Sequence, residues 1–207
     1  MTPHPTDAPG RTDDRALTDD VFEALVREGA AAFDRLARSH KGAFPNLIQA
    51  DSRGAREFLR DLRPPGPAFL ELGSGLGIIT IIADLLGYDA YGIEIEPRLV
   101  DESYRLAETC GSAATFIEGS FVPPDFQEEV ELLNADSHTV TTGADAYEEM
   151  GMDFSDFDLL FVHPWPDEIE WLHSLSRRHA APHAALLTYC VREGFVLVSC
   201  EALRSSG

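Results

Sequence analysis

The stretch Glu71-Leu72-Gly73-Ser74-Gly75-Leu76-Gly77 places three glycines at alternate positions, directly after the short apolar run Ala68 to Leu72. A run of this length that ends in turn residues predicts a buried strand, and the apolar stretch Ile78 to Leu86 predicts a helix that Gly87 ends. Glycines between them let the backbone pass close under a ligand, because no Cβ stands in the way. The stretch therefore predicts a strand, a ligand-binding turn and a helix, in that order.

The same alternation of strand and helix continues along the chain. Pro97 predicts the start of a helix that runs to about Thr109, and Pro166 predicts the start of another. Strands separated by helices of about ten residues pair in parallel through right-handed crossovers. We therefore expect an α/β fold with a doubly wound, mostly parallel sheet, whose further strands are Ala90 to Ile95, Ala114 to Glu118, Phe157 to Val162, Ala185 to Val191 and Phe195 to Ser199.

Three parts are expected along the chain. Residues 1–17 are rich in Thr, Pro, Asp and Arg, which is typical of a disordered tail. Residues 18–63 carry apolar side chains at helical spacing and are expected to form an N-terminal helical extension. Prolines 64, 65 and 67 then break the chain, so residues 64–207 are expected to form the domain that carries the sheet.

Two segments are expected to cover the ligand site as a lid. In the extension, one helix should start at Asp19 or Asp20, with Gly29 as an interruption, and a second should run from about Gly54 to Leu62. The other segment, Pro123 to Met152, is acidic and weakly periodic, and we expect a helix near residues 126–133 followed by an irregular insertion.

The net charge of −20 is unevenly placed: residues 1–63 carry 10 Lys or Arg against 11 Asp or Glu, and no Lys or Arg occurs between Arg105 and Arg177. Such a surface repels phosphate backbones, which argues against a nucleic-acid partner. No stretch has the roughly 20 apolar residues of a membrane span, and no secretory segment is evident, so a cytoplasmic protein is expected. The three cysteines and seven histidines show no metal-ligand spacing, so no metal site is expected.

Carboxylates stand at the ends of the first two expected strands. In a doubly wound sheet the ligand crevice lies beyond these ends. The dinucleotide fingerprint needs a small residue where Ile78 stands, which argues against NAD or FAD. Glu71 can accept hydrogen bonds from a cationic amino-acid moiety, and Glu94, followed by Ile95, stands where a carboxylate can receive both hydroxyls of a ribose.

At these residues the sequence resembles the class I S-adenosylmethionine-dependent methyltransferases, over roughly Phe69 to Val162. The resemblance implies a Rossmann-like fold and S-adenosyl-L-methionine as cofactor. Ser120 stands where the family often has an Asp that binds the adenine amino group, and it carries no charge. The residues implied to bind the cofactor are Glu71, Gly73, Ser74, Gly75, Gly77, Glu94, Ile95, Gly119, Ser120 and His163.

The fourth expected strand ends in His163-Pro164-Trp165-Pro166, which resembles the D/N-P-P-Y/W/F motif of amino-group methyltransferases and the D-P-W-P segment of tRNA 7-methylguanosine methyltransferases. The acidic continuation Asp167-Glu168-Ile169-Glu170 contradicts the RNA alternative. We name His163 as a candidate base and Trp165 as a candidate cover for the substrate, and both residues also suit plain packing at a strand end. Tyr189, near the end of the fifth strand, is a further candidate residue of the reaction centre, and it also suits core packing.

The function expected from these features is methyl transfer to an N or O nucleophile of a small-molecule or protein acceptor. An acidic rim would attract a cationic acceptor, and a weaker resemblance to the non-SET histone lysine methyltransferases over residues 70–94 fits that view. The alternative is a non-catalytic module that binds S-adenosylmethionine, a nucleoside or a partner, because only 16 residues follow Val191. Aminopropyl transfer is a third alternative, and the oligomeric state does not follow from the sequence.

Overall fold

The computed structural model describes residues 17–39, 47–62, 67–133 and 139–205. The expected tail lies outside these ranges except for Leu17, whose amide donates to the carbonyl of Leu85 at 3.2 Å. Most of the expected proline hinge lies outside them as well. Within the described residues, no helix combines the length and apolar character that crossing a membrane requires.

The strands form one mostly parallel sheet, which confirms the predicted fold class. Its order is β3-β2-β1-β4-β5-β6, so the chain moves outward from β1 through β2 and β3 and then crosses to β4 on the other side. Only the β5–β6 pairing is antiparallel among the described strands. The strands are β1 (Ala68–Leu72), β2 (Asp89–Glu94), β3 (Thr115–Glu118), β4 (Leu159–Val162), β5 (Ala185–Cys190) and β6 (Gly194–Ser199).

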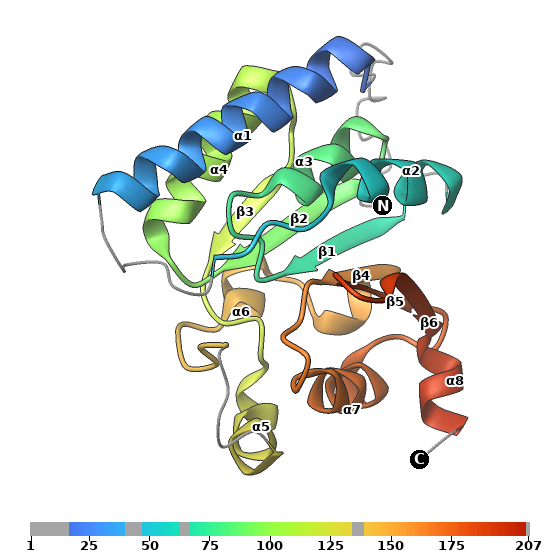
Figure 1. The fold of residues 1–207 in the computed structure, drawn as a ribbon. Coiled ribbons are helices and arrows are strands. Elements are labelled where there is room, and N and C mark those ends of the chain that lie inside the picture. Colours follow the sequence, from blue (N-terminus) through green and yellow to red (C-terminus); the bar gives the residue numbers. More distant parts are fainter. Residues whose placement is uncertain (1–16, 40–46, 63–66, 134–138, 206–207) are drawn as a thin grey trace, which may run out of the picture.

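Helices cover both faces of the sheet (Figure 1). One face carries α1 (Asp19–Ser39), α2 (Ser52–Leu62), α3 (Ile78–Leu85) and α4 (Pro97–Cys110), and the other carries α5 (Gln127–Leu133), α6 (Ala146–Met150), α7 (Ile169–His179) and α8 (Cys200–Ser205). Alternate residues of β1 enter the two cores, since Phe69 packs with the first group and Leu70 and Leu72 pack with the second. This period of two is what a strand buried on both faces requires.

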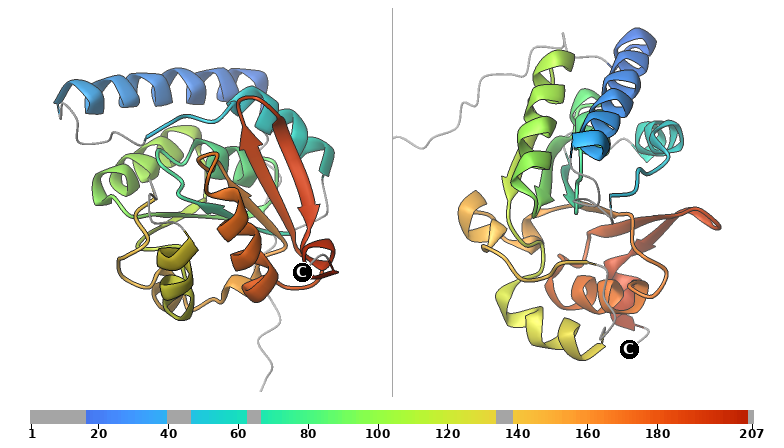
Figure 2. Two further views of the ribbon diagram at one scale, coloured as in Figure 1. Left: turned by 60° about the horizontal axis from the view of Figure 1, so that its bottom comes forward. Right: turned by 60° about the vertical axis from the view of Figure 1, so that its left-hand side comes forward.

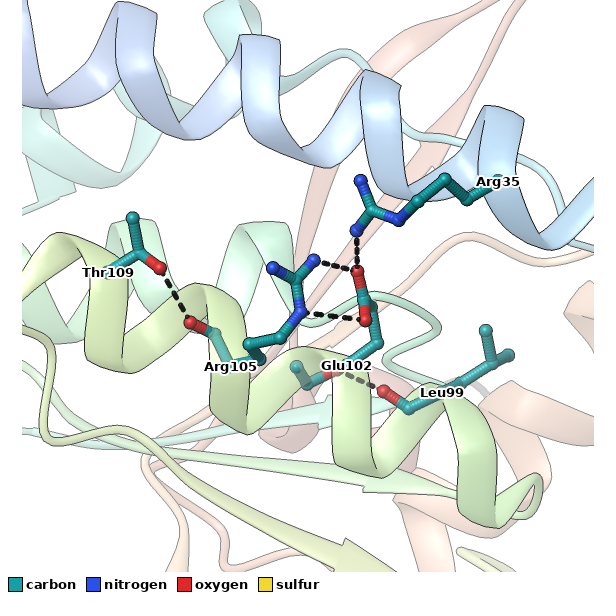
Figure 3. A network of polar contacts seen from close by, with 6 residues as sticks. Arg35, Leu99, Glu102, Arg105 and Thr109 are labelled. Carbon is teal, nitrogen blue, oxygen red and sulfur yellow. Dashed lines mark hydrogen bonds and ion pairs between the residues drawn. The ribbon is translucent and has the colours of Figure 1, made fainter.

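Helix α1 lies along α3 and α4 and is unbroken at Gly29, contrary to the expected interruption. A Cβ at Gly29 would lie 2.6 Å from Cδ1 of Ile78, so the glycine lets α1 approach α3 closely. Arg35 of α1 and Arg105 of α4 both bind the carboxylate of Glu102, with Arg35 Nη2 2.5 Å from Oε1 (Figure 3). The helical extension is thereby tied to the sheet domain.

The acidic segment contains more regular structure than expected after Leu133. The carboxylate of Asp145 accepts from the amides of Tyr147 at 2.9 Å and Glu148 at 3.4 Å, which caps α6. Two 3₁₀ turns, Pro124–Phe126 and Phe154–Asp156, flank the region. The expected helix near residues 126–133 is present as α5, whereas the prediction of an irregular insertion after it was wrong at α6, because a side-chain cap can start a short helix without a long apolar period.

The carboxyl-terminal strands form a hairpin at the edge of the sheet, beside α2 (Figure 2). Phe58 of α2 stacks on Phe195 of β6 with ring centroids 5.7 Å apart. The chain then forms α8, so within the described residues the sheet ends at β6.

Gly77 is required both by its backbone angle and by its neighbours. Its φ is 68°, and an added Cβ would lie 2.3 Å from Cε1 of Phe116. Gly111, with φ 70° and no atom within 4 Å of such a Cβ, is a matched control. We expect Gly111→Ala to lower the free energy of unfolding by about 1–2 kcal/mol, and Gly77→Ala by about 1–3 kcal/mol more, because only the second overpacks the core. Urea unfolding measures both, and equal losses would contradict the packing argument.

Candidate functional site

The glycine-rich turn after β1 is fixed to the end of the neighbouring strand. The amides of Gly73 and Ser74 both donate to the carbonyl of Ile93, at 3.0 and 2.8 Å, and the amide of Gly77 donates to the carbonyl of Ser74 at 2.7 Å. The three glycines of the turn, Gly73, Gly75 and Gly77, all have positive φ, between 54° and 75°. The turn therefore passes over the carboxyl ends of β1 and β2, where the sequence predicted it.

Glu94 holds this turn from the end of β2. Its Oε2 accepts from the amide of Gly75 at 2.8 Å, and its Oε1 accepts from the amide of Glu96 at 3.0 Å. The residue is 9% exposed, and this burial raises the pKa of the carboxyl, although the backbone donors oppose the shift. Each carboxylate oxygen has a second lone pair, so Glu94 can still accept hydrogen bonds from a ligand.

Glu71 is a buried carboxyl group beneath the turn. Its Oε2 accepts from the amide of Thr80 at 2.9 Å and from Oγ1 of Thr80 at 2.5 Å. Burial, together with the nearby charge of Glu94, raises the pKa of Glu71 to about 8, against the effect of the Thr80 hydrogen bonds. A cation placed against this group would favour its charged form.

A cavity of about 1140 Å³ lies over the carboxyl ends of the strands. It is lined by side chains from α1, from residues 47–50, from the turns after β1, β2, β3 and β4, from α7 and from the β5–β6 hairpin. The two segments predicted to form a lid both contribute, through Val26, Gly29 and Ala30 of α1 and through Thr139 and Val140. The predicted site residues that line it are Glu71, Gly73, Ser74, Gly75, Glu94, Ile95, Gly119, His163 and Trp165.

Three of the predicted cofactor residues differ in their surroundings. The hydroxyl of Ser120 donates to the carbonyl of Thr141 at 2.6 Å and accepts from the amide of Val122 at 3.1 Å, and Ser120 is not among the lining residues. Gly77 faces Phe116. Ser74 Oγ is buried without a hydrogen-bond partner among the described residues. Ser74 therefore lines the cavity whereas Gly77 and Ser120 do not, and a contact of these three residues with the cofactor stays a prediction.

His163 and Trp165 both border the cavity at the end of β4. Partial burial lowers the pKa of His163, and a hydrogen bond with the backbone of Ile48 opposes the shift. The imidazole is therefore neutral near pH 7 and able to accept a proton. Tyr189 does not line the cavity but packs edge-on against His163, with ring centroids 5.0 Å apart.

Glu168 joins this region to the acidic insertion, a role that the sequence did not reveal. It is 1% exposed, and its carboxylate accepts from the amide and the hydroxyl of Thr139, at 2.9 and 2.8 Å, and from the amide of Trp165 at 3.3 Å. In the sequence it is one residue of the acidic continuation Asp167-Glu168-Ile169-Glu170 that contradicts the RNA alternative. Glu168 stands at the start of α7 but makes no side-chain cap hydrogen bond to that helix, so no capping pattern in the sequence indicated these contacts.

The raised pKa of Glu71 predicts a specific dependence of stability on pH. The folded-state pKa of about 8 exceeds the ordinary value of 4.5, so the folded protein holds the Glu71 proton more tightly than the unfolded chain does. The resulting contribution to the free energy of unfolding is complete below pH 4.5 and is lost as the pH rises through 8. Glu71→Gln should flatten this fall, because an amide does not titrate. Urea unfolding between about pH 5 and about pH 8 measures it.

Glu118 provides the control for that experiment. It pairs in register with Glu94, is exposed and lies at the end of β3. Glu118→Gln should keep the pH dependence of the unsubstituted protein, and a Glu71→Gln protein that does the same would refute the assignment.

Comparison with known proteins gives one match in sequence and several in structure. No protein-family model matches the chain. Over 61 residues, 30% of the chain, the sequence is 39% identical to the ribosomal protein L11 methyltransferase of Thermus thermophilus. The matched region is 24% of that protein, so the chain spans about a quarter of the curated relative that it matches.

Solved structures with a similar fold include an RNA methyltransferase from Salinibacter ruber in complex with S-adenosyl-L-homocysteine, at 20% identity and a TM-score of 0.48, over 68% of this chain and 76% of that chain. An O-methyltransferase from Bacillus cereus is 14% identical with a TM-score of 0.46, over 83% of this chain and 66% of that chain. The sheet order gives this chain a Rossmann-like fold, as the sequence predicted, and the sequence match over 61 residues is to a methyltransferase.

Proposed function

We propose that this chain binds S-adenosyl-L-methionine and transfers its methyl group to a nitrogen or oxygen nucleophile of a small-molecule or protein acceptor. The observation that carries the proposal is that groups from the ends of three strands border one cavity: the turn after β1, Glu94 of β2 and His163 after β4. The match to a methyltransferase over 61 residues supports it.

The residues around the turn suit the chemistry of this cofactor. Glu94 can accept hydrogen bonds from two ribose hydroxyls while it holds Gly75. Glu71, buried and with its pKa raised to about 8, is a carboxyl group that a positively charged amino-acid moiety would ionise. The cavity, at about 1140 Å³, is larger than the roughly 300–1,000 Å³ of an ordinary small-molecule pocket.

The chemical role of the protein residues is to align the reactants and accept a proton. When bound, S-adenosylmethionine supplies an electrophilic methyl group. His163 borders the cavity and is neutral near pH 7, so it can take the proton that an N or O nucleophile loses. Trp165 lies beside it and can cover an acceptor, while Glu168 holds the amide of Trp165 in place. Alignment of this kind contributes much of the rate in a direct displacement.

Calorimetry with S-adenosylhomocysteine tests cofactor binding. We expect Glu94→Ala to weaken binding by about tenfold or more, because the ligand loses a charged acceptor and the turn loses its support at Gly75. Glu118→Ala is the matched control, since Glu118 occupies the same register on the next strand and does not line the cavity. A protein that binds no S-adenosylhomocysteine, or a Glu94→Ala protein that binds it unchanged, would count against the proposal.

Transfer of labelled methyl groups to a cell extract and a metabolite panel tests the role of His163. His163→Ala should lower the transfer rate by about 10²-fold and leave the affinity for S-adenosylhomocysteine within about threefold, because the base acts only in the chemical step. His183, which is exposed and bound to Asp158 at 2.9 Å, supplies a control in His183→Ala. An equal loss in both variants would contradict a catalytic role.

A non-catalytic module that binds the cofactor is the second candidate function. Binding of S-adenosylhomocysteine without transfer to any member of the panel is the outcome that this candidate predicts.

A further inference from the structure

The large apolar side chains that are exposed in the described residues gather around the cavity. Four of the seven line it: Ile48, Val140, Val191 and Val196. They come from segments far apart in the sequence, namely the connection before α2, the acidic insertion, and the β5–β6 hairpin. Single exposed apolar residues are common in proteins. A group of them around one cavity instead indicates a binding site for an apolar ligand, whose surface they would cover.

The cavity continues inward from this rim along an apolar wall. Ile169 and Leu172 of α7 line it on one side, and Val198 of β6 lines it together with Val196. We call these four residues, with Ile48, Val140, Val191 and Trp165, the apolar half of the cavity. The other half consists of the glycine-rich turn, Glu71 and Glu94.

Sheet register places the apolar half next to the candidate base. Val196 of β6 pairs with Thr188 of β5, and Thr188 pairs with Val162, the residue before His163. Two strand spacings separate Val196 from Val162, which is about 10 Å. A molecule of about that length on the hairpin side can therefore present one end to His163.

The charges around the cavity exclude one class of acceptor. Its acidic and basic lining side chains, apart from histidines, are five glutamates, Glu71, Glu94, Glu96, Glu168 and Glu193, and one arginine, Arg192. Glu71 is mainly protonated at pH 7, because burial raises its pKa to about 8, so the negative charge comes from the other glutamates. His163 and His173 also line it, and partial burial lowers the pKa of both. An anionic acceptor would meet this excess of carboxyl groups without a matching set of cations.

We propose that the apolar half binds the methyl acceptor, and that this acceptor is a small, uncharged or cationic molecule with an apolar body and a nucleophilic nitrogen or oxygen at one end. The inference rests on the proposed function for the identity of the reaction. The apolar body lies against Val196, Val198 and Leu172, and the nucleophilic end reaches the region of His163.

Three naphthalene compounds test the charge and shape of the site: uncharged 2-naphthol, anionic 2-naphthoate and cationic 2-naphthylmethylammonium. Binding is measured by calorimetry at pH 7 with saturating S-adenosylhomocysteine. We expect the first and third compounds to bind about tenfold more tightly than 2-naphthoate, because they share its ring but avoid the repulsion. Equal affinity for 2-naphthoate, or no binding of any of the three at millimolar concentration, would overturn the proposal.

Two adjacent residues of β6 give a matched pair of variants. Val196 and Leu197 are 38% and 39% exposed, but only Val196 lines the cavity, and Leu197 pairs with Leu187 and so points to the opposite face of the sheet. Val196→Asp should weaken 2-naphthol binding by about tenfold or more, because it places a carboxylate in the apolar wall. Leu197→Asp should leave the affinity unchanged, and equal losses would refute the assigned wall.

Binding of S-adenosylhomocysteine by the same two variants separates this inference from the proposed function. Both should retain it, because Val196 and Leu197 lie away from the turn and Glu94. If 2-naphthol binds with the expected dependence on Val196 but S-adenosylhomocysteine does not bind, the apolar site stands and the methyltransferase proposal fails. If the cofactor product binds and 2-naphthol does not, the acceptor inference alone fails.

Discussion

The hydrogen bond from the amide of Gly75 to the carboxylate of Glu94 joins the turn after β1 to the end of β2, and the geometry of the site depends on it. The turn has three residues with positive φ. It is also held by the amides of Gly73 and Ser74, which donate to Ile93, and by the hydroxyl of Ser103, which donates to the carbonyl of Gly75 at 3.1 Å. A buried carboxylate is costly unless it is hydrogen-bonded, so Glu94 and the turn stabilise each other. The same carboxylate faces the cavity, which couples the shape of the turn to the ligand that it receives.

The features that the sequence predicted are those encoded by local pattern. The glycine spacing, the apolar runs and the prolines located the strands, the turn and the helix starts to within a few residues, and strand ends in a parallel sheet lie at one edge. That rule predicts Glu71, Glu94 and His163 at one site, and all three line the cavity. It could not assign each side chain a contact, since Ser120 stands at a strand end and binds Thr141.

The features that the sequence did not predict depend on contacts between distant segments. In the sequence, Glu168 is one acid in a run of acids. Only the fold brings Thr139 to it, where the amide and hydroxyl of Thr139 donate to a carboxylate that is buried. The low helix propensity of glycine predicts an interruption of the helix at Gly29. The structure instead needs a glycine there, because Ile78 approaches the helix too closely for a Cβ. In both positions tertiary packing decided the outcome, and no local period reports such packing.

The two halves of the cavity place opposite demands on what binds there, and the position of His163 follows from both. The half around Glu71 and Glu94 suits positive charge and hydrogen-bond donors, whereas the wall of α7 and β6 suits apolar surface. His163 stands between them directly after β4, beside the point where the order of strands reverses. Partial burial there keeps the imidazole neutral, and a neutral imidazole is compatible with an apolar neighbour and can still accept a proton. A lysine or a carboxylate at this position would carry its charge into the apolar wall, and this cost explains why a histidine suits the end of β4.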